Sequence, residues 1–410
     1  MKLNATIAGV GMTRFGKYLD RGLKSIGAEA VVAALKDAGI EKSDLQAAWV
    51  GNAAAGVVTG QECIRGEVVL RGMGIGKIPV VNVENACASS STAFNQACAM
   101  VSAGYYDCVL ALGVEKLYHE DKRKTFGAFS GAVDVEAFAE IMAGLKKSAE
   151  ASGAGTASKG AGEKRSMFMD IYAMAARGHM KAYGTTVEQF AGVSAKNSLH
   201  GSLNSRAQYR EALSVEEVLS SPMIAEPLTR PMCSPIGDGA AAVVIVSERK
   251  AKQLGIQKSV RVLSSVLRSG WDKEVGESGV AMLAVNEAYE EAGIGPQDLS
   301  VIELHDASAP AEIMAYEDLG LCGKGEGGSL ISDGSTRLGG RLPVNTSGGL
   351  LRKGHPVGAT GIAQIVELTE QLQGRSGERQ VEGARLGLAH NGGGTIGTDA
   401  AALCITILGN

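Results

Sequence analysis

A short pattern that occurs twice in this chain of 410 residues constrains its fold more than any other feature. The two copies share residues and spacing at a constant offset of 254 residues: Ala38-Gly39-Ile40, Asp44-Leu45 and Val50 match Ala292-Gly293-Ile294, Asp298-Leu299 and Leu304. In each copy a helical stretch is followed by a glycine suited to end it, an acidic spacer and an apolar run typical of a strand. A duplication of this kind predicts two similar α/β halves packed about a pseudo-two-fold axis.

The segments around the two copies predict a division into three parts. Residues 1–114 together with 236–258 form the first half, residues 259–410 form the second half, and residues 115–235 form an inserted loop domain. The inserted region interrupts the alternation of strands and helices, so we expect it to cap a site built by the two halves. Within it, residues 144–166 are rich in Gly, Ala, Ser and Lys and predict a mobile, exposed loop.

Cys87 is the first candidate for chemistry. The apolar residues 78–83 predict a short buried strand before it, and the apolar residues of 94–101 recur at helical spacing after it. A thiol at such a strand-to-helix turn faces unpaired backbone N–H groups and the positive end of the helix dipole, which favour the thiolate. The sequence therefore predicts a nucleophilic cysteine, with an inert buried cysteine as the alternative.

Three of the six histidines lie at the ends of predicted strands or in glycine-rich turns: His305, His355 and His390. Such positions line the ligand crevice of α/β sheets. A cysteine with several histidines suits acyl transfer, in which a thiolate attacks a carbonyl, one imidazole moves the proton and others hydrogen-bond the oxyanion. The glycines that follow at 392–394 would let backbone N–H groups approach a substrate oxygen.

Composition excludes several other classes of function. The net charge of −4 gives no electrostatic basis for binding nucleic acid, and no apolar run is long enough to cross a membrane. The sequence has neither CxxC nor HExxH, so we expect no metal site. Seven cysteines without paired spacing, and an N-terminus without the apolar core of a signal peptide, indicate reduced thiols and a cytoplasmic location.

Three motifs show that nearly the whole chain resembles the thiolase superfamily: Asn85-Ala86-Cys87-Ala88-Ser89-Ser90, Asp238-Gly239-Ala240-Ala241-Ala242 and Gly354-His355-Pro356-Val357-Gly358-Ala359-Thr360-Gly361. The pair His305-Asp306 resembles the sterol-carrier-protein branch and its bacterial and archaeal acetyl-CoA acetyltransferase-like relatives. The resemblance implies a thiolase fold, with two βαβαβαββ halves in a five-layer αβαβα arrangement and an inserted loop domain. It also implies a homodimer or a dimer of dimers.

The resemblance further implies a role for each residue of the site. Cys87 would carry the acyl group, His355 would activate Cys87 and help bind the thioester oxygen, and His305 would complete that first oxyanion hole. The backbone N–H groups of Cys87 and Gly392 would form the second. Coenzyme A would be a co-substrate that enters across the inserted region, with no bound cofactor. Relatives of this branch often work with a small zinc-ribbon and OB-fold protein, which suggests such a partner here.

The chain departs from the thiolase pattern in one respect. Thiolases normally carry a second cysteine as acid/base, but the matching positions here are His390-Asn391-Gly392 and His305-Asp306-Ala307, without a thiol. Three explanations stay open. His390, with an ordinary pKa of about 6.5, takes over the acid/base role; His355 acts twice; or the second acid/base step is lost.

The sequence therefore predicts an enzyme, an acyltransferase of the thiolase type. It would cleave a 3-oxoacyl-CoA with coenzyme A into two acyl-CoAs through an acyl-cysteine. The missing cysteine favours a non-standard substrate, aromatic, branched or dicarboxylic, in a degradation pathway. The alternatives are a C-acyltransferase (synthase) or retro-aldol lyase of the same fold, and a non-catalytic subunit that binds acyl-CoA or lipid, in which Cys87 could be replaced without loss.

Overall fold

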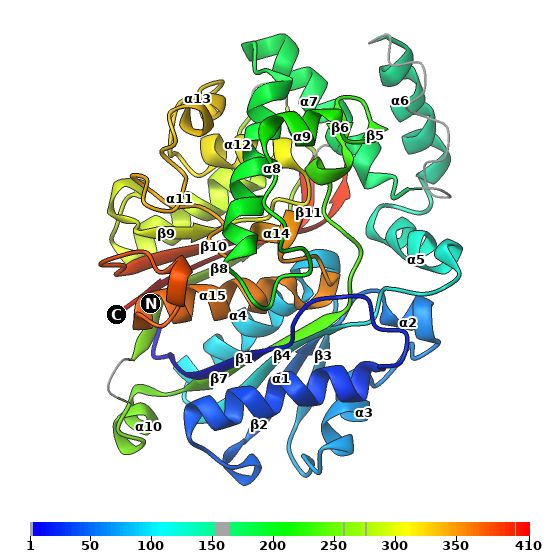
Figure 1. Cartoon of the computed structure of the whole chain (residues 1–410). Helices are drawn as coiled ribbons and strands as arrows, with labels where there is room; N and C mark the ends of the chain where they lie inside the picture. Colours follow the sequence, from blue (N-terminus) through cyan, green and yellow to red (C-terminus); the bar gives the residue numbers. More distant parts are fainter. Residues whose placement is uncertain (1–2, 152–164, 257–258, 275–276, 398) are drawn as a thin grey trace.

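The computed structural model of the protein describes residues 3–151, 165–256, 259–274, 277–397 and 399–410. Its largest element is one mixed sheet of nine strands in the order β3-β2-β4-β7-β1-β8-β11-β10-β9 (Figure 1). The first five positions hold β1 (Thr6–Met12), β2 (Ala47–Gly51), β3 (Val80–Val83), β4 (Cys108–Glu115) and β7 (Gly239–Val246). The other four hold β8 (Val260–Arg268), β9 (Val301–Glu303), β10 (Leu386–Ile396) and β11 (Asp399–Gly409).

The strand order contains the predicted duplication. In the first half β2 is parallel to β3 and β4, and β7 is antiparallel to β4 and β1. The second half repeats the pattern, since β9 is parallel to β10 and forms a bridge from Ile302 to Val344, while β11 is antiparallel to β10 and β8. β1 and β8 join the halves by a short antiparallel pairing. The order is therefore symmetric about the boundary between β1 and β8.

The helices follow the same division. Those of the first half are α1 (Leu23–Ala38), α2 (Ala55–Thr59), α3 (Arg65–Gly72), α4 (Ser89–Ser102) and, after β7, α10 (Glu248–Gln253). Those of the second half are α11 (Val280–Ala292), α12 (Ala309–Asp318), α13 (Gly327–Ser332), α14 (Gly349–Arg352) and α15 (Thr360–Gln373). Gly39 and Gly293 end α1 and α11 with φ of 65° and 69°, so both copies of the repeat use a left-handed glycine as predicted.

The two halves enclose a shared central layer. α4 and α15 lie between the halves of the sheet, α1 and α3 cover the outer face of the first half, and α11 and α12 that of the second (Figure 1). The apolar stripe of α4 packs in one buried cluster with that of α15, which includes Ile362, Ile365 and Val366. This is the five-layer αβαβα arrangement that the resemblance implied. It brings the N-termini of two equivalent helices together in the middle of the molecule.

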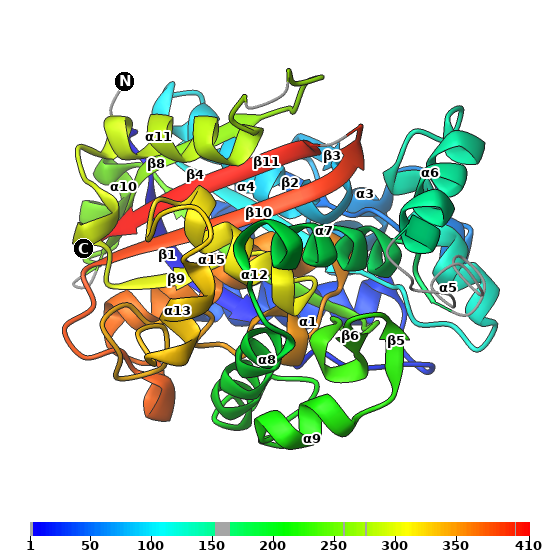
Figure 2. The same cartoon turned by 90° about the horizontal axis from the view of Figure 1, so that it is seen from above.

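The strands β4 and β7 are neighbours in the sheet, and the long segment that joins them contains several helices. These helices lie above the second half and at one end of the molecule (Figures 1 and 2). The elements of the segment are α5 (Lys122–Phe129), α6 (Phe138–Ala151), α7 (Phe168–Tyr183), α8 (Val187–Ser202), α9 (Val215–Ser220) and the pair β5 (Met223–Ala225) and β6 (Leu228–Thr229). α7 and α8 pack against α12. We propose, on this connectivity, that 115–235 is the inserted domain.

Two local predictions were wrong. Residues 144–151 belong to helix α6 rather than to a loop, because Ala, Leu, Lys and Glu are strong helix formers; residues 152–164 of the predicted loop lie outside the described residues. The strand before Cys87 was expected to be buried, but β3 is the edge of the sheet and only Val83 of its four residues is buried. An apolar run identifies a strand and does not show whether it has one neighbour or two.

Candidate active site

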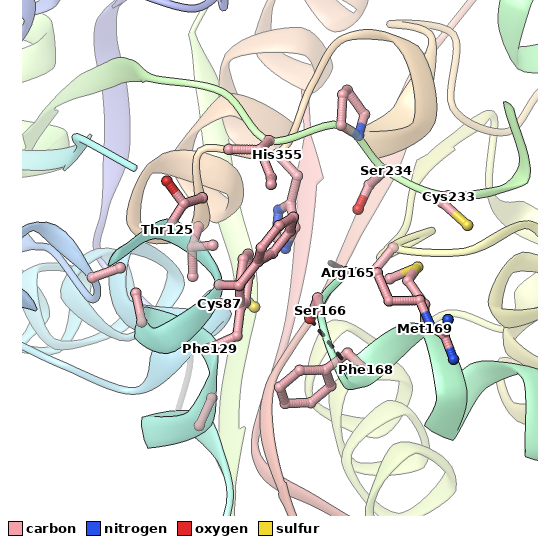
Figure 3. A pocket seen from close by; sticks show the side chains of 18 of the residues that line it. Cys87, Thr125, Phe129, Arg165, Ser166, Phe168, Met169, Cys233, Ser234 and His355 are labelled. Atoms are coloured by element: carbon pink, nitrogen blue, oxygen red, sulfur yellow. Dashed lines mark hydrogen bonds between the residues drawn. The ribbon is translucent and has the colours of Figure 1, made fainter. Parts of the chain in front are cut away.

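The candidate nucleophile, Cys87, lies on a tight turn between β3 and α4. A 3-10 turn at Ala86–Ala88 leads into the helix, and Ala86 has a φ of 48°. Ser89 closes the turn, since its hydroxyl accepts from the Asn85 N–H at 2.9 Å and donates to the Ala86 carbonyl at 2.6 Å. Cys87 is thereby held at the wall of a cavity of about 780 Å³, which also contains His355 (Figure 3).

The loop that carries His355, here called the histidine loop, occupies the equivalent place in the second half. A 3-10 turn at Val357–Ala359 leads into α15 and contacts the turn that carries Cys87. Gly361 permits this approach, because a Cβ there would lie 1.9 Å from the hydroxyl of Ser91. The glycines of the histidine motif thus serve close packing of the two helix N-termini.

The structure brings Cys87, His305 and His355 together. The sulfur and one ring nitrogen of each histidine lie within 4.8 Å of one another, and the two rings meet edge to face with centroids 5.2 Å apart. All three residues line the cavity. They come from three elements far apart in the sequence: the turn before α4, the end of β9 and the loop before α15.

Hydrogen bonds assign the protons of His355. Its Nδ1 lies 2.7 Å from the hydroxyl of Thr360, and that hydroxyl donates to the Pro356 carbonyl at 3.1 Å. With the hydroxyl proton assigned to the Pro356 carbonyl, Nδ1 carries a proton and donates it to Thr360. The Nε2 of His355 is therefore unprotonated in the neutral ring and is available as a base.

His305 has the opposite tautomer. The Asn391 side-chain oxygen accepts from Ser91 at 2.5 Å, which turns the Asn391 amide nitrogen toward His305 Nδ1 at 2.9 Å. The amide donates, so the neutral ring of His305 carries its proton on Nε2. One imidazole of the site is a base and the other is a hydrogen-bond donor, as a nucleophile and an oxyanion hole require.

Burial decides the resting protonation states. It raises the pKa of Cys87 to about 12, with Glu115 adding to the rise, and backbone hydrogen bonds from Gly394 and Cys87 only partly oppose it. Burial also lowers the pKa of His355 to about 3 and that of His305 well below its ordinary value. The helix N-terminus was expected to lower the pKa of Cys87, but desolvation outweighs the dipole here and the pKa is raised. We therefore expect a thiol and neutral imidazoles in the resting site, with the thiolate formed during the reaction.

His390 lies behind this group. Its Nδ1 accepts the backbone N–H of His305 at 3.3 Å, its carbonyl accepts from Gln364 at 3.1 Å, and it is not among the residues of the cavity wall. Burial lowers its pKa to about 4. We propose that His390 positions His305 rather than acting as the second acid/base.

The glycine-rich end of β10 packs directly on the nucleophile turn. A Cβ on Gly393 would lie 2.1 Å from the Asn85 carbonyl oxygen, so only glycine fits. Gly392 and Gly394 both line the cavity. The sequence singled out Gly392 for the second oxyanion hole, and that role stays a proposal; the backbone N–H beside the Cys87 sulfur belongs to Gly394.

Two buried carboxylates shape the wall, and sequence reasoning missed both roles. Glu115 accepts from the backbone N–H groups of Ala53, Ala54 and Gly358, and so ties the loop after β2 to the histidine loop. Asp238, in the DGAAA motif, accepts from the N–H groups of Leu117 and Tyr118 at 2.7 Å and from Lys116 Nζ at 2.7 Å. The second carboxylate fixes the cavity wall at the start of the inserted segment.

The cavity beyond Cys87 is mainly apolar, with charges at its margins. In Figure 3, Phe129 lies near Cys87, while Arg165, Met169 and Cys233 lie across the cavity. Its apolar and aromatic lining includes Phe126, Phe129, Phe168, Met169, Tyr172 and Ile224. Its cationic lining includes Lys17, Lys122, Arg165, Arg230 and Arg352. Residues of 115–235 supply most of both sets, which supports the proposal that this segment caps the site.

A half-buried thiol with an imidazole nitrogen beside it and an N–H donor at the same point is an arrangement suited to an enzyme that transfers acyl groups through a cysteine. The chain belongs to the thiolase family. The family model "Thiolase, N-terminal domain" matches residues 5–249, and "Thiolase C-terminal domain-like" matches residues 273–409. The protein is thus an acyltransferase of the thiolase type.

Individual relatives agree with this membership. An acetyl-CoA acetyltransferase of Methanothermobacter thermautotrophicus is 40% identical over 97% of this chain and 98% of its own. Benzoylsuccinyl-CoA thiolase subunit BbsB of Thauera aromatica is 37% identical over 95% of this chain and 94% of its own. Among solved structures, the Ltp2-ChsH2(DUF35) aldolase matches with a TM-score of 0.78 and 27% identity, covering 99% of this chain and 97% of that chain.

Two further findings concern the cysteines and the possibility of a membrane-spanning helix. All seven cysteines fall within the described ranges, and every one is a free thiol. Within those ranges, no helix combines the length and the apolar character that crossing a membrane needs.

Proposed function

We propose that this thiolase cleaves a 3-oxoacyl-CoA with coenzyme A into two acyl-CoAs. The observation that carries the proposal is the grouping of Cys87, His305 and His355, with hydrogen bonds that assign opposite tautomers to the two rings. The bare Nε2 of His355 takes the Cys87 proton as the sulfur attacks the 3-oxo carbon. The resulting imidazolium and the Nε2–H of His305 then both donate to the thioester oxygen, whose negative charge grows as the C–C bond breaks.

We propose further that the acyl group is not a simple acetyl group but an aromatic, branched or dicarboxylic one. The cavity of about 780 Å³ is far larger than an acetyl group needs, and Phe126, Phe129 and Phe168 can pack against a ring. Arg165 lies on the same wall, paired with Asp170 at 2.5 Å. The Thauera relative is named for benzoylsuccinyl-CoA, an acyl-CoA of that class. A degradation pathway would supply such a substrate.

The test is the intact mass of the protein after incubation with a panel of acyl-CoAs and 3-oxoacyl-CoAs. We expect an acyl adduct on the wild type and none on Cys87→Ser, with the adduct mass naming the transferred group. A Cys87→Ser variant that cleaves 3-oxoacyl-CoA at the wild-type rate would overturn the acyl-cysteine mechanism.

The second candidate is a retro-aldol lyase, favoured by the similarity to the Ltp2-ChsH2(DUF35) aldolase. A retro-aldol reaction forms no acyl-enzyme, so it gives no reason for the assembled Cys87, His305 and His355. The same panel separates the two, because a lyase yields free aldehyde or ketone and no adduct. A synthase of the same fold would show the adduct but no cleavage, and a purely binding subunit would show neither.

The exposed edge of the sheet supports a homodimer. β3 ends the strand order with no further partner among the described residues, and Val81 is 38% exposed there. Such an edge pairs with another strand unless it is covered. We propose that two copies meet along β3, alone or within a dimer of dimers. We also propose a small zinc-ribbon and OB-fold partner, because the Thauera relative is named a subunit and the aldolase match is named with ChsH2(DUF35).

The dimer gives a direct prediction. A charge at the edge, Val81→Lys, is expected to convert a wild-type dimer to monomer at micromolar concentration, measured by sedimentation velocity. Val215→Lys, at a 37% exposed position on α9 far from β3 in the sequence, is the matched control and should remain dimeric. A wild type that sediments as a monomer at the same concentration would contradict the proposal.

A further inference from the structure

The proposed cleavage needs a proton donor that the three histidines do not provide. When the C–C bond breaks, the α-carbon of the departing acyl-CoA carries the electron pair and has to be protonated. The Cys87 proton goes to His355, which then holds the thioester oxygen. His305 is committed as a donor by Asn391, and His390 lies off the cavity wall. The proposed cleavage therefore requires one further acid/base group.

Tyr172 is placed to supply it. This residue lies on α7 of the inserted segment, lines the same cavity as Cys87, and packs through its ring on the apolar cluster of the second half. The charges of Cys87 and Asp306 both act on its hydroxyl. Tyr172 is half-buried at the cavity wall, and no hydrogen bond joins its hydroxyl to any residue in the part of the chain that the structure describes. Its proton is free for a ligand.

We propose that Tyr172 is a further catalytic residue, the acid and base for the α-carbon and the incoming thiol; this inference rests on the proposed function. In the first half-reaction Cys87 gives its proton to His355 and attacks, and the phenol protonates the released α-carbon and becomes a phenolate. In the second, the phenolate takes the proton of coenzyme A, the new thiolate attacks the acyl-cysteine, and the leaving Cys87 thiolate recovers its proton from His355. Both residues return to their starting state.

The direction of each proton transfer fits a phenol at the cavity wall. Burial raises the pKa of Tyr172 above its ordinary value, so the group enters the cycle protonated, as an acid must. Once formed, the phenolate is a far stronger base than a thiolate, whose parent thiol has a pKa of about 8.5. The imidazolium of His355 exists at the same stage, so the two new charges in the cavity offset each other.

Cys233 is the competing candidate, because it is a second thiol on the cavity wall. Its sulfur contacts the Thr229 carbonyl at 3.6 Å, and the charges that act on it are those of Arg165 and Asp170 rather than that of Cys87. Figure 3 places it across the cavity from Cys87. Both residues line the cavity, and the charge of Cys87 acts on Tyr172 and not on Cys233, so Tyr172 is the candidate and Cys233→Ala is the matched control.

The experiment follows the α-carbon directly. Full-length wild type, Tyr172→Phe and Cys233→Ala are incubated with acetyl-CoA in D2O, and uptake of deuterium at the α-carbon is read by mass spectrometry. We expect Tyr172→Phe to lose exchange by about 100-fold and Cys233→Ala to keep it within about threefold. The rate at which iodoacetamide alkylates Cys87 should be the same in all three proteins, because that reaction needs only Cys87 and His355.

Each other outcome has a defined meaning. Wild-type exchange in Tyr172→Phe, or its loss in Cys233→Ala alone, would assign the step to another group and overturn the inference. A wild type that forms the Cys87 adduct but exchanges no deuterium would overturn it and leave the proposed function standing. A wild type that forms no adduct with any thioester would overturn both. Slower alkylation of Cys87 in Tyr172→Phe would show a structural role only.

Discussion

Replacing His355 by glutamine is expected to slow the acylation of Cys87 by about 10³-fold or more, near the upper end for loss of a general base. The pKa of Cys87 is raised to about 12 by burial, so hardly any thiolate exists at neutral pH without help. In the proposed mechanism the unprotonated Nε2 of His355 takes the proton as the sulfur attacks. Glutamine keeps the size and polarity of the side chain but offers no basic nitrogen.

The pH dependence of Cys87 acylation should differ between the wild type and His355→Gln. His355 works as a base only when unprotonated, and its pKa is lowered to about 3, so activity is lost only as the pH falls toward that value. The wild type should therefore show no inflection near pH 6.5, the ordinary pKa of histidine. His355→Gln depends on preformed thiolate, and its rate should rise about tenfold for each pH unit between 7 and 10.

Rapid-quench intact mass of the acyl adduct between pH 6 and 10 measures both profiles. Thr360→Val is the informative control, because it removes the oxygen that holds His355 Nδ1–H but keeps the imidazole. We expect it to fall between the wild type and His355→Gln in rate and to keep the wild-type pH profile. A His355→Gln variant that acylates Cys87 at the wild-type rate would show that another group takes the proton.

Much of this architecture follows from the sequence because the constraint is repetitive. The two AGI turns predicted two matching halves, and the symmetric strand order around β1 and β8 agrees with them. The helix stripe after Cys87 and the stripe of α15 identified the two central helices, which meet in one buried cluster. Periodicity and glycine positions report local geometry, and a duplication extends that information to the whole sheet.

The chemistry of the site was less accessible, because it depends on distances between segments far apart in the chain. A helix N-terminus in isolation favours a thiolate, yet burial beside Glu115 reverses the sign of the Cys87 pKa shift. The proton positions on His305 and His355 depend on Asn391 and Thr360, and only the folded hydrogen bonds show them. Tyr172 lies in a helix whose pattern of Met and Ala signals nothing but burial.

The second large effect is expected at His305. Replacing it by leucine should lower kcat for cleavage by about 10²- to 10³-fold, the cost of losing one oxyanion-hole donor. KM should change little, because the donor is needed mainly when charge develops on the thioester oxygen in the transition state. His305→Asn keeps a side-chain N–H and should recover a large part of the loss.

Asn391 should affect the rate by orienting the ring of His305 and not by contacting the substrate itself. Asn391→Leu removes the amide that keeps the His305 proton on Nε2, so this variant alone should lower kcat by about tenfold or more. In the His305→Leu background the same change should add almost nothing, because the ring that Asn391 orients is gone. Steady-state kinetics of the four proteins complete this double-mutant cycle. Two independent, multiplying losses would mean that Asn391 contacts the substrate itself, and the tautomer assigned to His305 would then have no part in the rate.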